Sequence, residues 1–206
     1  MPNYADINGR PMKKLQIEQY LRKLQLNDFE PAVNLATLTK LQDAHLKYIP
    51  YENFDSLNGK ITSLKRQDMF NKVIMHNRGG ICFELNGLYN WLLESLGFEV
   101  TSYAARFIDK METYQLRRHR VMCVALGEKR YLTDVGVNSE SPRVPLEITE
   151  GLIQSDGISQ YKFTRSEFWG WLLWQKERGK IWKRLFGFTE EPQIDKDFIT
   201  ASFWCD

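Results

Sequence analysis

The sequence predicts an α+β protein, in which a helical bundle is followed by an antiparallel sheet or small β-barrel. Apolar residues recur at helical spacing in four segments between Ile17 and Leu96. From about Phe98 onward they gather in short runs separated by turn residues, which is typical of strands. With 206 residues, of which 43% are hydrophobic, the chain can bury a sizeable core. We therefore expect a helical domain in residues 1–97 and a β-barrel-like domain in residues 98–206, packed tightly because no flexible linker separates them.

Four helices are expected in the first domain. They cover Ile17 to Leu24, Leu35 to Leu46, Met69 to Met75, and Cys82 to about Leu96. Pro50 closes the second helix, and Gly97 stands where a C-cap is expected after the fourth. Residues 1–12 are expected to form a loose arm over the body of the protein.

Four strands are expected in the second domain, at residues 98–108, 120–126, 129–135 and 158–164. Residues 166–188 are peculiar because the segment is both basic and rich in tryptophan, and two interpretations are open. The segment is either a surface that binds a membrane or a partner groove, or an edge strand with a loop or helix whose aromatic rings pack on the barrel. Packing is favoured, since aromatic side chains are more often core than contact surface. Any part of this C-terminal aromatic surface that stays exposed predicts self-association.

A hairpin is expected where Gly127 and Glu128 form a two-residue turn between the second and third strands. That register places Asp134 opposite Val121. His119 lies on the same face as Val121, because strand side chains alternate with period two. His119 and Asp134 are then diagonal neighbours, about 7–8 Å apart at the backbone and within side-chain reach. A slip of one residue would put them on opposite faces.

The most informative residue is Cys82, which follows Gly79-Gly80 and begins the fourth predicted helix. The free N–H groups and positive dipole at a helix start favour the thiolate, which is the nucleophilic form of cysteine. A nucleophilic cysteine needs a base and a group that orients the base, and the hairpin offers His119 and Asp134. Each residue also has a plainer interpretation. Cys82 is then a small buried hydrophobic residue, His119 a surface residue in a basic cluster, and Asp134 a solvated carboxylate.

Several motifs together resemble the arylamine N-acetyltransferases. They are Arg78-Gly79-Gly80-x-Cys82-x-Glu84-x-Asn86, His119 before an apolar strand, Asp134-Val135-Gly136, and Pro50-Tyr51-Glu52-Asn53-Phe54, which is similar to the family's Pro-Phe-Glu-Asn-Leu segment. The resemblance implies that Cys82, His119 and Asp134 are a catalytic Cys-His-Asp triad, arranged as in cysteine proteases. It implies acetyl-coenzyme A as acyl donor, an arylamine or hydrazine as acceptor, and a ping-pong reaction through an acetyl-cysteine. It also implies a buried charge-assisted bond between Glu52 and Arg78 that holds the cysteine loop.

The chain departs from the family pattern at two places. Family members usually continue into a third, mixed α/β lid domain, which we expect to be absent because the chain stops about where it would begin. The glycine-rich stretch after the aspartate appears as Val137-Asn138-Ser139-Glu140, so the coenzyme A-binding residues are unknown. Two alternatives follow. One is a truncated family member that is weakly active, inactive, or turned towards hydrolysis of acetyl-coenzyme A. The other is a papain-like or transglutaminase-like cysteine hydrolase.

Composition excludes several other classes. A net charge of only +2 argues against a nucleic-acid partner. No apolar run approaches the roughly 18 residues of a membrane span, so no membrane partner is expected. Cys82, Cys123 and Cys205 are widely separated and the N-terminus has no hydrophobic signal core, which predicts a cytoplasmic protein. His45 and His76 lack ligand spacing, so we expect no metal.

Overall fold

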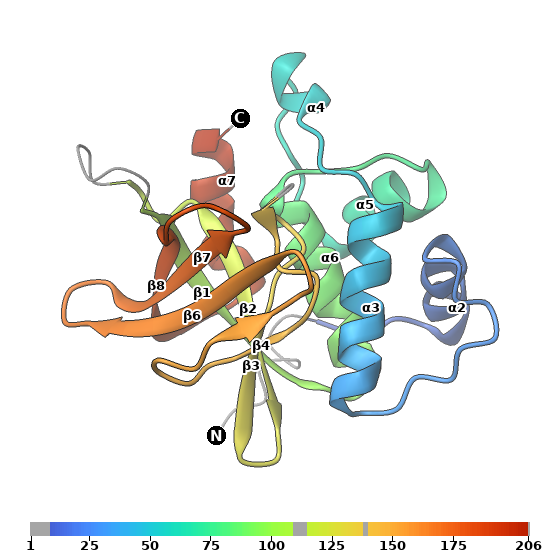
Figure 1. Cartoon of the computed structure of the whole chain (residues 1–206). Coiled ribbons are helices and arrows are strands. Elements are labelled where there is room, and N and C mark those ends of the chain that lie inside the picture. The colour runs from blue at the N-terminus through green and yellow to red at the C-terminus, as the bar shows by residue number, and fades with distance from the viewer. Residues whose placement is uncertain (1–8, 109–114, 138–139, 206) are drawn as a thin grey trace.

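The computed structural model describes residues 9–108, 115–137 and 140–205 (Figure 1). Its first half is helical, and its second half forms a curved sheet that ends in a short helix. The helical elements before the sheet are α2 (Lys14–Lys23), α3 (Leu35–Tyr48), α4 (Phe54–Leu57), α5 (Arg66–Phe70), the π-helical turn η1 (Asn71–Met75) and α6 (Cys82–Ser95). The strands are β1 (Glu99–Phe107), β2 (His119–Leu126), β3 (Lys129–Thr133), β4 (Leu146–Glu147), β5 (Gln154–Ser155), β6 (Ser159–Ser166), β7 (Gly170–Glu177) and β8 (Lys183–Gln193). The 3₁₀ turn η3 (Asp195–Phe198) and helix α7 (Ile199–Cys205) follow.

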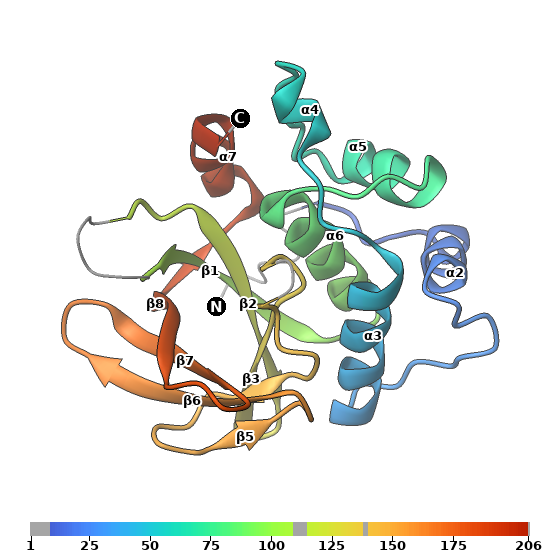
Figure 2. The same cartoon turned by 45° about the horizontal axis from the view of Figure 1, so that its top comes forward.

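The eight strands form one antiparallel sheet in the order β4-β3-β2-β1-β8-β7-β6-β5. The sheet curls into a barrel-like shape beside the helices (Figure 2). Its two ends are joined by the segment after β4. Leu146 pairs with Leu132 on β3, and Glu150 bridges to Phe163 on β6. This crossing segment covers edges that would otherwise expose unpaired backbone groups.

The β2 strand separates two cores. Val121 and Cys123 point into the barrel, where they join Phe163 and other rings. Met122 and Val124 point the other way and pack with the helices. Because both faces of β2 are covered, its sequence is a continuous apolar run and shows no alternation. Helix α6 lies against that outer face and is buried from Cys82 to Leu93, which makes it the central helix of the molecule.

The predicted fold class is confirmed, and so are the positions of four helices and four strands. The division into domains at residue 97 stays a prediction. The third predicted helix is in part a π-helical turn, since only α5 before it is α-helical. Of the predicted N-terminal arm, residues 1–8 lie outside the described residues, while Met12 is buried and its N–H bonds Ser95.

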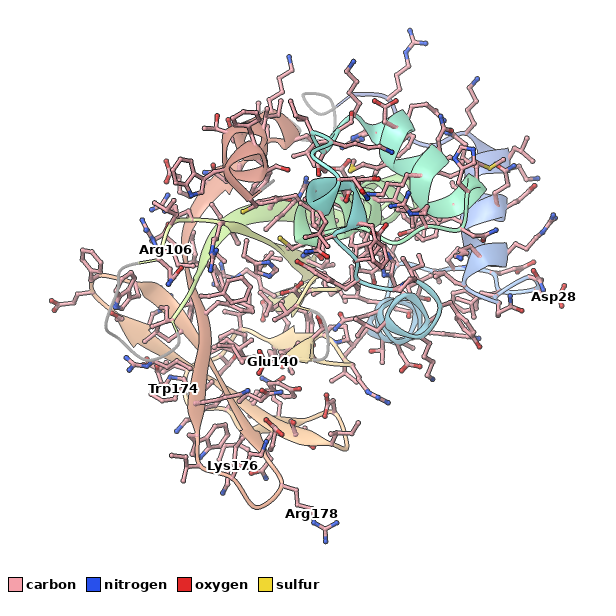
Figure 3. All side chains as sticks on the ribbon, turned by 90° about the horizontal axis from the view of Figure 1, so that it is seen from above. Asp28, Arg106, Glu140, Trp174, Lys176 and Arg178 are labelled. Atoms are coloured by element: carbon pink, nitrogen blue, oxygen red, sulfur yellow. The ribbon has the colours of Figure 1, made fainter. Side chains whose placement is uncertain are left out.

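The Trp-rich segment was predicted as an edge strand with a loop or helix, and the structure instead forms β7 and β8 from it. β8 is not an edge, because it lies between β1 and β7. Its Phe186 and Phe188 are fully buried in the barrel, and this apolar run fixes the strand in the interior of the sheet. Trp174, Lys176 and Arg178 lie on the side of the sheet remote from the helices (Figure 3).

None of the helices in the described ranges is long and apolar enough to cross a membrane. Self-association and a cytoplasmic location stay predictions. The exposed apolar side chains near the C-terminus include Ile199, Phe203 and Trp204 on α7.

Candidate active site

Cys82 is the first residue of α6, as the sequence predicts, and it retains 7% of its exposed area. The two glycines before it are required by close packing. A Cβ on Gly79 would lie 2.0 Å from the carbonyl oxygen of Pro50, and one on Gly80 would lie 2.8 Å from the carboxylate of Glu84. Glu84 caps the helix, since its Oε2 accepts the Ile81 N–H at 2.9 Å. The chain therefore reaches Cys82 along one fixed path.

The loop before Cys82 is held by charged side chains. Arg78 donates from Nε to Glu52 Oε1 at 3.0 Å, and its Nη2 lies 3.2 Å from Asp55 Oδ1. The predicted Glu52–Arg78 bond is thus present. Arg78 is not buried, however, because 38% of its side chain is exposed against 8% for Glu52. The backbone supports the same contact, since the Glu52 N–H donates to the Gly80 carbonyl at 3.0 Å.

The hairpin has the predicted register, with Leu126 paired to Lys129 and Met122 paired to Thr133. The next residue, Asp134, therefore comes level with Val121 and reaches the histidine one pleat away. His119 Nε2 donates to Asp134 Oδ2 at 2.7 Å, and both side chains are fully buried. The rings of Phe107 and Phe186 lie 5.0 and 5.3 Å from the imidazole and shield this pair from water.

The imidazole is the group on which Cys82 and Asp134 act together. Burial by itself would lower the pKa of His119. The charge and hydrogen bond of Asp134, together with Cys82, outweigh it and raise that pKa to about 10. Asp134 and Cys82 thus favour the protonated form of His119. Its Nδ1 is buried and has no hydrogen-bond partner among the described residues, while Cys82 Sγ lies 3.7 Å from the carbonyl oxygen of Arg118.

Asn86 ties the helix to both halves of the hairpin. Its Nδ2 donates to the Arg120 carbonyl at 2.6 Å and to Asp134 Oδ1 at 2.8 Å, and its Oδ1 accepts the Val135 N–H at 2.9 Å. Asp134 Oδ1 also accepts the Gly136 N–H at 2.8 Å, so one carboxylate oxygen is fixed by the protein and the other faces His119. Rotation of the aspartate is thereby prevented.

Gly136 is where the strand end meets the cysteine. A Cβ at this position would lie 2.8 Å from the Cα of Cys82 and 2.7 Å from Nδ2 of Asn86. Only glycine allows the loop after Asp134 to approach α6 so closely. Of the residues that follow, Asn138 and Ser139 lie outside the described residues, so the predicted departure from the glycine-rich pattern has no structural account.

The three predicted site residues are thus brought to one place from α6, β2 and the end of β3. No group of three or more metal-binding side chains occurs within residues 9–108, 115–137 and 140–205. His45 is buried on α3, near the core as expected, and His76 is exposed after η1. The sequence did not single out Asn86 as a link between the three. The signal was its position four residues after Cys82, which puts both on one helix face.

Comparison with known proteins shows the family of the chain. An N-acetyltransferase family model matches residues 34–206. An arylamine N-acetyltransferase of Mycolicibacterium smegmatis is 34% identical over 191 residues, covering 90% of this chain and 68% of that protein. The chain belongs to the arylamine N-acetyltransferase family. An enzyme of that name from Escherichia coli (strain K12) is 31% identical over 174 residues, which cover 84% of this chain.

The fold is shared as well. The solved structure of the Mycobacterium marinum arylamine N-acetyltransferase in complex with CoA superposes with a TM-score of 0.84 at 26% identity, covering 91% of this chain and 70% of that one. This chain spans 61% of the length of the E. coli relative. The helical part and the barrel described above correspond to the shared portion.

Proposed function

We propose that this protein transfers an acetyl group from acetyl-coenzyme A to the nitrogen of an arylamine or hydrazine, with Cys82 as nucleophile, His119 as proton carrier and Asp134 as the group that orients it. The observation that carries the proposal is the buried His119–Asp134 pair, 2.7 Å apart, placed against a cysteine at a helix start. Family membership supports the same chemistry. The solved family member bound to CoA supports a thioester of coenzyme A as the donor.

In the first half-reaction the imidazolium of His119 stabilises the thiolate of Cys82. The sulfur attacks the thioester carbonyl carbon, and the carbonyl oxygen becomes an oxyanion. Leu85 is the first residue of α6 whose N–H finds an intrahelical partner, the Ile81 carbonyl. The N–H groups of Cys82 and Phe83 precede it and are suited to bind the oxyanion. The bond to coenzyme A breaks, and the departing thiolate takes the proton of His119.

In the second half-reaction the acceptor nitrogen attacks the acetyl-cysteine. His119, now neutral, removes the amine proton and keeps it, while the C–S bond breaks and Cys82 leaves as the thiolate that the imidazolium stabilises. The products are the acetylated amine and the free enzyme. Asp134 keeps Nε2 of the ring engaged, which leaves Nδ1 for the sulfur side in both steps. The aromatic shell of Phe107 and Phe186 limits water, which would otherwise hydrolyse the thioester.

Intact mass measurement after mixing with acetyl-coenzyme A tests the proposal. We expect one added acetyl group that is absent in Cys82→Ser and is lost again when an arylamine is supplied. Cys205→Ser is the matched control, because Cys205 is the exposed cysteine. An adduct that survives in Cys82→Ser would overturn the assignment of the nucleophile. Coenzyme A release that runs faster without amine than the amine-dependent rate would favour a hydrolase.

A further inference from the structure

A second cluster of charges lies beside the cysteine loop, and Lys72 is its centre. The Nζ of Lys72 lies 2.8 and 3.1 Å from the two carboxylate oxygens of Glu84 and 2.9 Å from Asp55 Oδ2. Its side chain is 17% exposed, and that of Glu84 only 3%. Lys72 is thus the cation that accompanies the buried capping carboxylate of α6.

The backbone of Lys72 holds the same loop. Its carbonyl accepts the Arg78 N–H at 3.1 Å. This is possible because residues 71–75 form a π-helical turn, which widens the helix and frees a carbonyl for a partner outside it. One residue therefore contacts the chain on both sides of Cys82, Arg78 before it through its backbone and Glu84 after it through its side chain.

Electrostatics gives this contact a consequence for the thiol. The start of α6 offers one positive end, and both the Glu84 carboxylate and the Cys82 sulfur lie in its first turn. An uncompensated carboxylate so close to the sulfur would disfavour a second negative charge. The ammonium of Lys72 offsets the charge of Glu84. The positive potential at the start of the helix then remains available to stabilise negative charge on the sulfur.

We propose that Lys72 is a positioning residue for Cys82, which acts through Glu84 by holding the carboxylate in its capping position and offsetting its charge. The proposal rests on the proposed function for its biological meaning. Its physical content is the reactivity of one thiol, which can be measured without acetyl-coenzyme A. The two proposals therefore fail separately.

The test is the rate of Cys82 alkylation by iodoacetamide as a function of pH, in a Cys205→Ser background. Lys72→Met is expected to slow alkylation at pH 7 about tenfold, equivalent to a shift of about one unit in the midpoint of the profile. Lys72→Arg keeps the charge and is expected to stay close to the wild-type rate. Each variant is measured well below its own melting temperature, so that only folded protein reacts.

A double variant separates positioning from general stability. Glu84→Gln removes the charge and keeps an oxygen that can accept the Ile81 N–H. If Lys72 acts through Glu84, Lys72→Met/Glu84→Gln recovers most of the rate lost in Lys72→Met. A merely structural role predicts further loss instead. The matched control is Arg66→Met, which removes a similarly buried cation paired at 2.6 Å with Glu94 near the other end of α6.

Arg66→Met is expected to lower the melting temperature and leave the alkylation profile unchanged. A wild-type profile in folded Lys72→Met, or no recovery in the double variant, would overturn the role of Lys72. A wild-type protein that alkylates normally but takes no acetyl group would instead count against the proposed function alone.

Discussion

The buried histidine of α3 makes a quantitative prediction about stability against pH. His45 is fully buried, and neither ring nitrogen has a hydrogen-bond partner among the described residues. The rings of Tyr20 and Tyr89 lie 6.0 and 5.3 Å away. Burial lowers the pKa of His45 from 6.5 to about 3, so the folded protein keeps this ring neutral where the unfolded chain protonates it.

The sign follows from proton binding. Between about pH 3 and pH 6.5 the unfolded chain holds one more proton than the folded protein at His45. The free energy of unfolding therefore rises with pH in that window by about 1.4 kcal/mol per unit. The contribution is complete above pH 6.5 and is lost as the pH falls. From pH 7 to pH 4.5 the loss is about 2.7 kcal/mol, a large share of the roughly 5–15 kcal/mol that stabilise a domain.

Urea unfolding at a series of pH values checks this number. His45→Leu replaces the ring by an apolar side chain of similar volume, and at pH 7.5 we expect its stability to lie within about 1.5 kcal/mol of wild type. Between pH 4.5 and pH 6 its slope should be smaller than that of the wild type by about 1.4 kcal/mol per unit. Carboxylates contribute equally to both proteins and cancel in the difference. The exposed His76→Leu serves as control and should follow the wild type. Parallel lines for wild type and His45→Leu would refute the reasoning.

Three further predictions concern the site. Asp134→Asn removes the charge that raises the pKa of His119, so the imidazole loses its proton near neutral pH. Single-turnover acetylation should then fall about 10²- to 10⁴-fold. An unchanged rate contradicts the role of Asp134. Asn86→Ala removes a buried hydrogen-bond partner from the Arg120 carbonyl and the Val135 N–H, and one of several from the Asp134 carboxylate. Urea unfolding should show a loss of about 2–4 kcal/mol, and a loss below about 0.5 kcal/mol would exclude the link. Gly136→Ala forces a methyl group against Cys82. We expect about 1–3 kcal/mol of destabilisation together with slower alkylation of the thiol. A wild-type alkylation rate would show that the loop can move aside.

Local rules were sufficient for the elements that carry the three predicted residues. The glycine pair and helical spacing placed Cys82 at the start of α6, and the two-residue turn fixed the register of β2 and β3. These features depend on neighbours in the chain, where turn chemistry and periodicity act directly. The contact between His119 and Asp134 follows from that register alone.

Other features depend on partners distant in the chain. The Trp-rich segment forms two inner strands, since β7 lies between β6 and β8 and β8 lies between β1 and β7. Lys72 has no signature of its own, and its importance appears when η1 brings it to Glu84, twelve residues later. Arg78 was expected in a buried bond, but 38% of its side chain is exposed although Gly79 and Gly80 after it are buried.

The position of Asn86 explains how a cysteine on α6 and a histidine on β2 share a fixed geometry. Cys82 and Asn86 are one helical turn apart, so any shift of α6 along its axis moves both together. Asn86 bonds the strand of His119 through the Arg120 carbonyl and the carboxylate of Asp134 directly. A displacement that separated the sulfur from the imidazole would therefore break buried hydrogen bonds that water cannot replace. The helix therefore holds the sulfur and the asparagine in fixed positions relative to each other. Moving it would cost the buried hydrogen bonds that also hold the histidine strand and the aspartate.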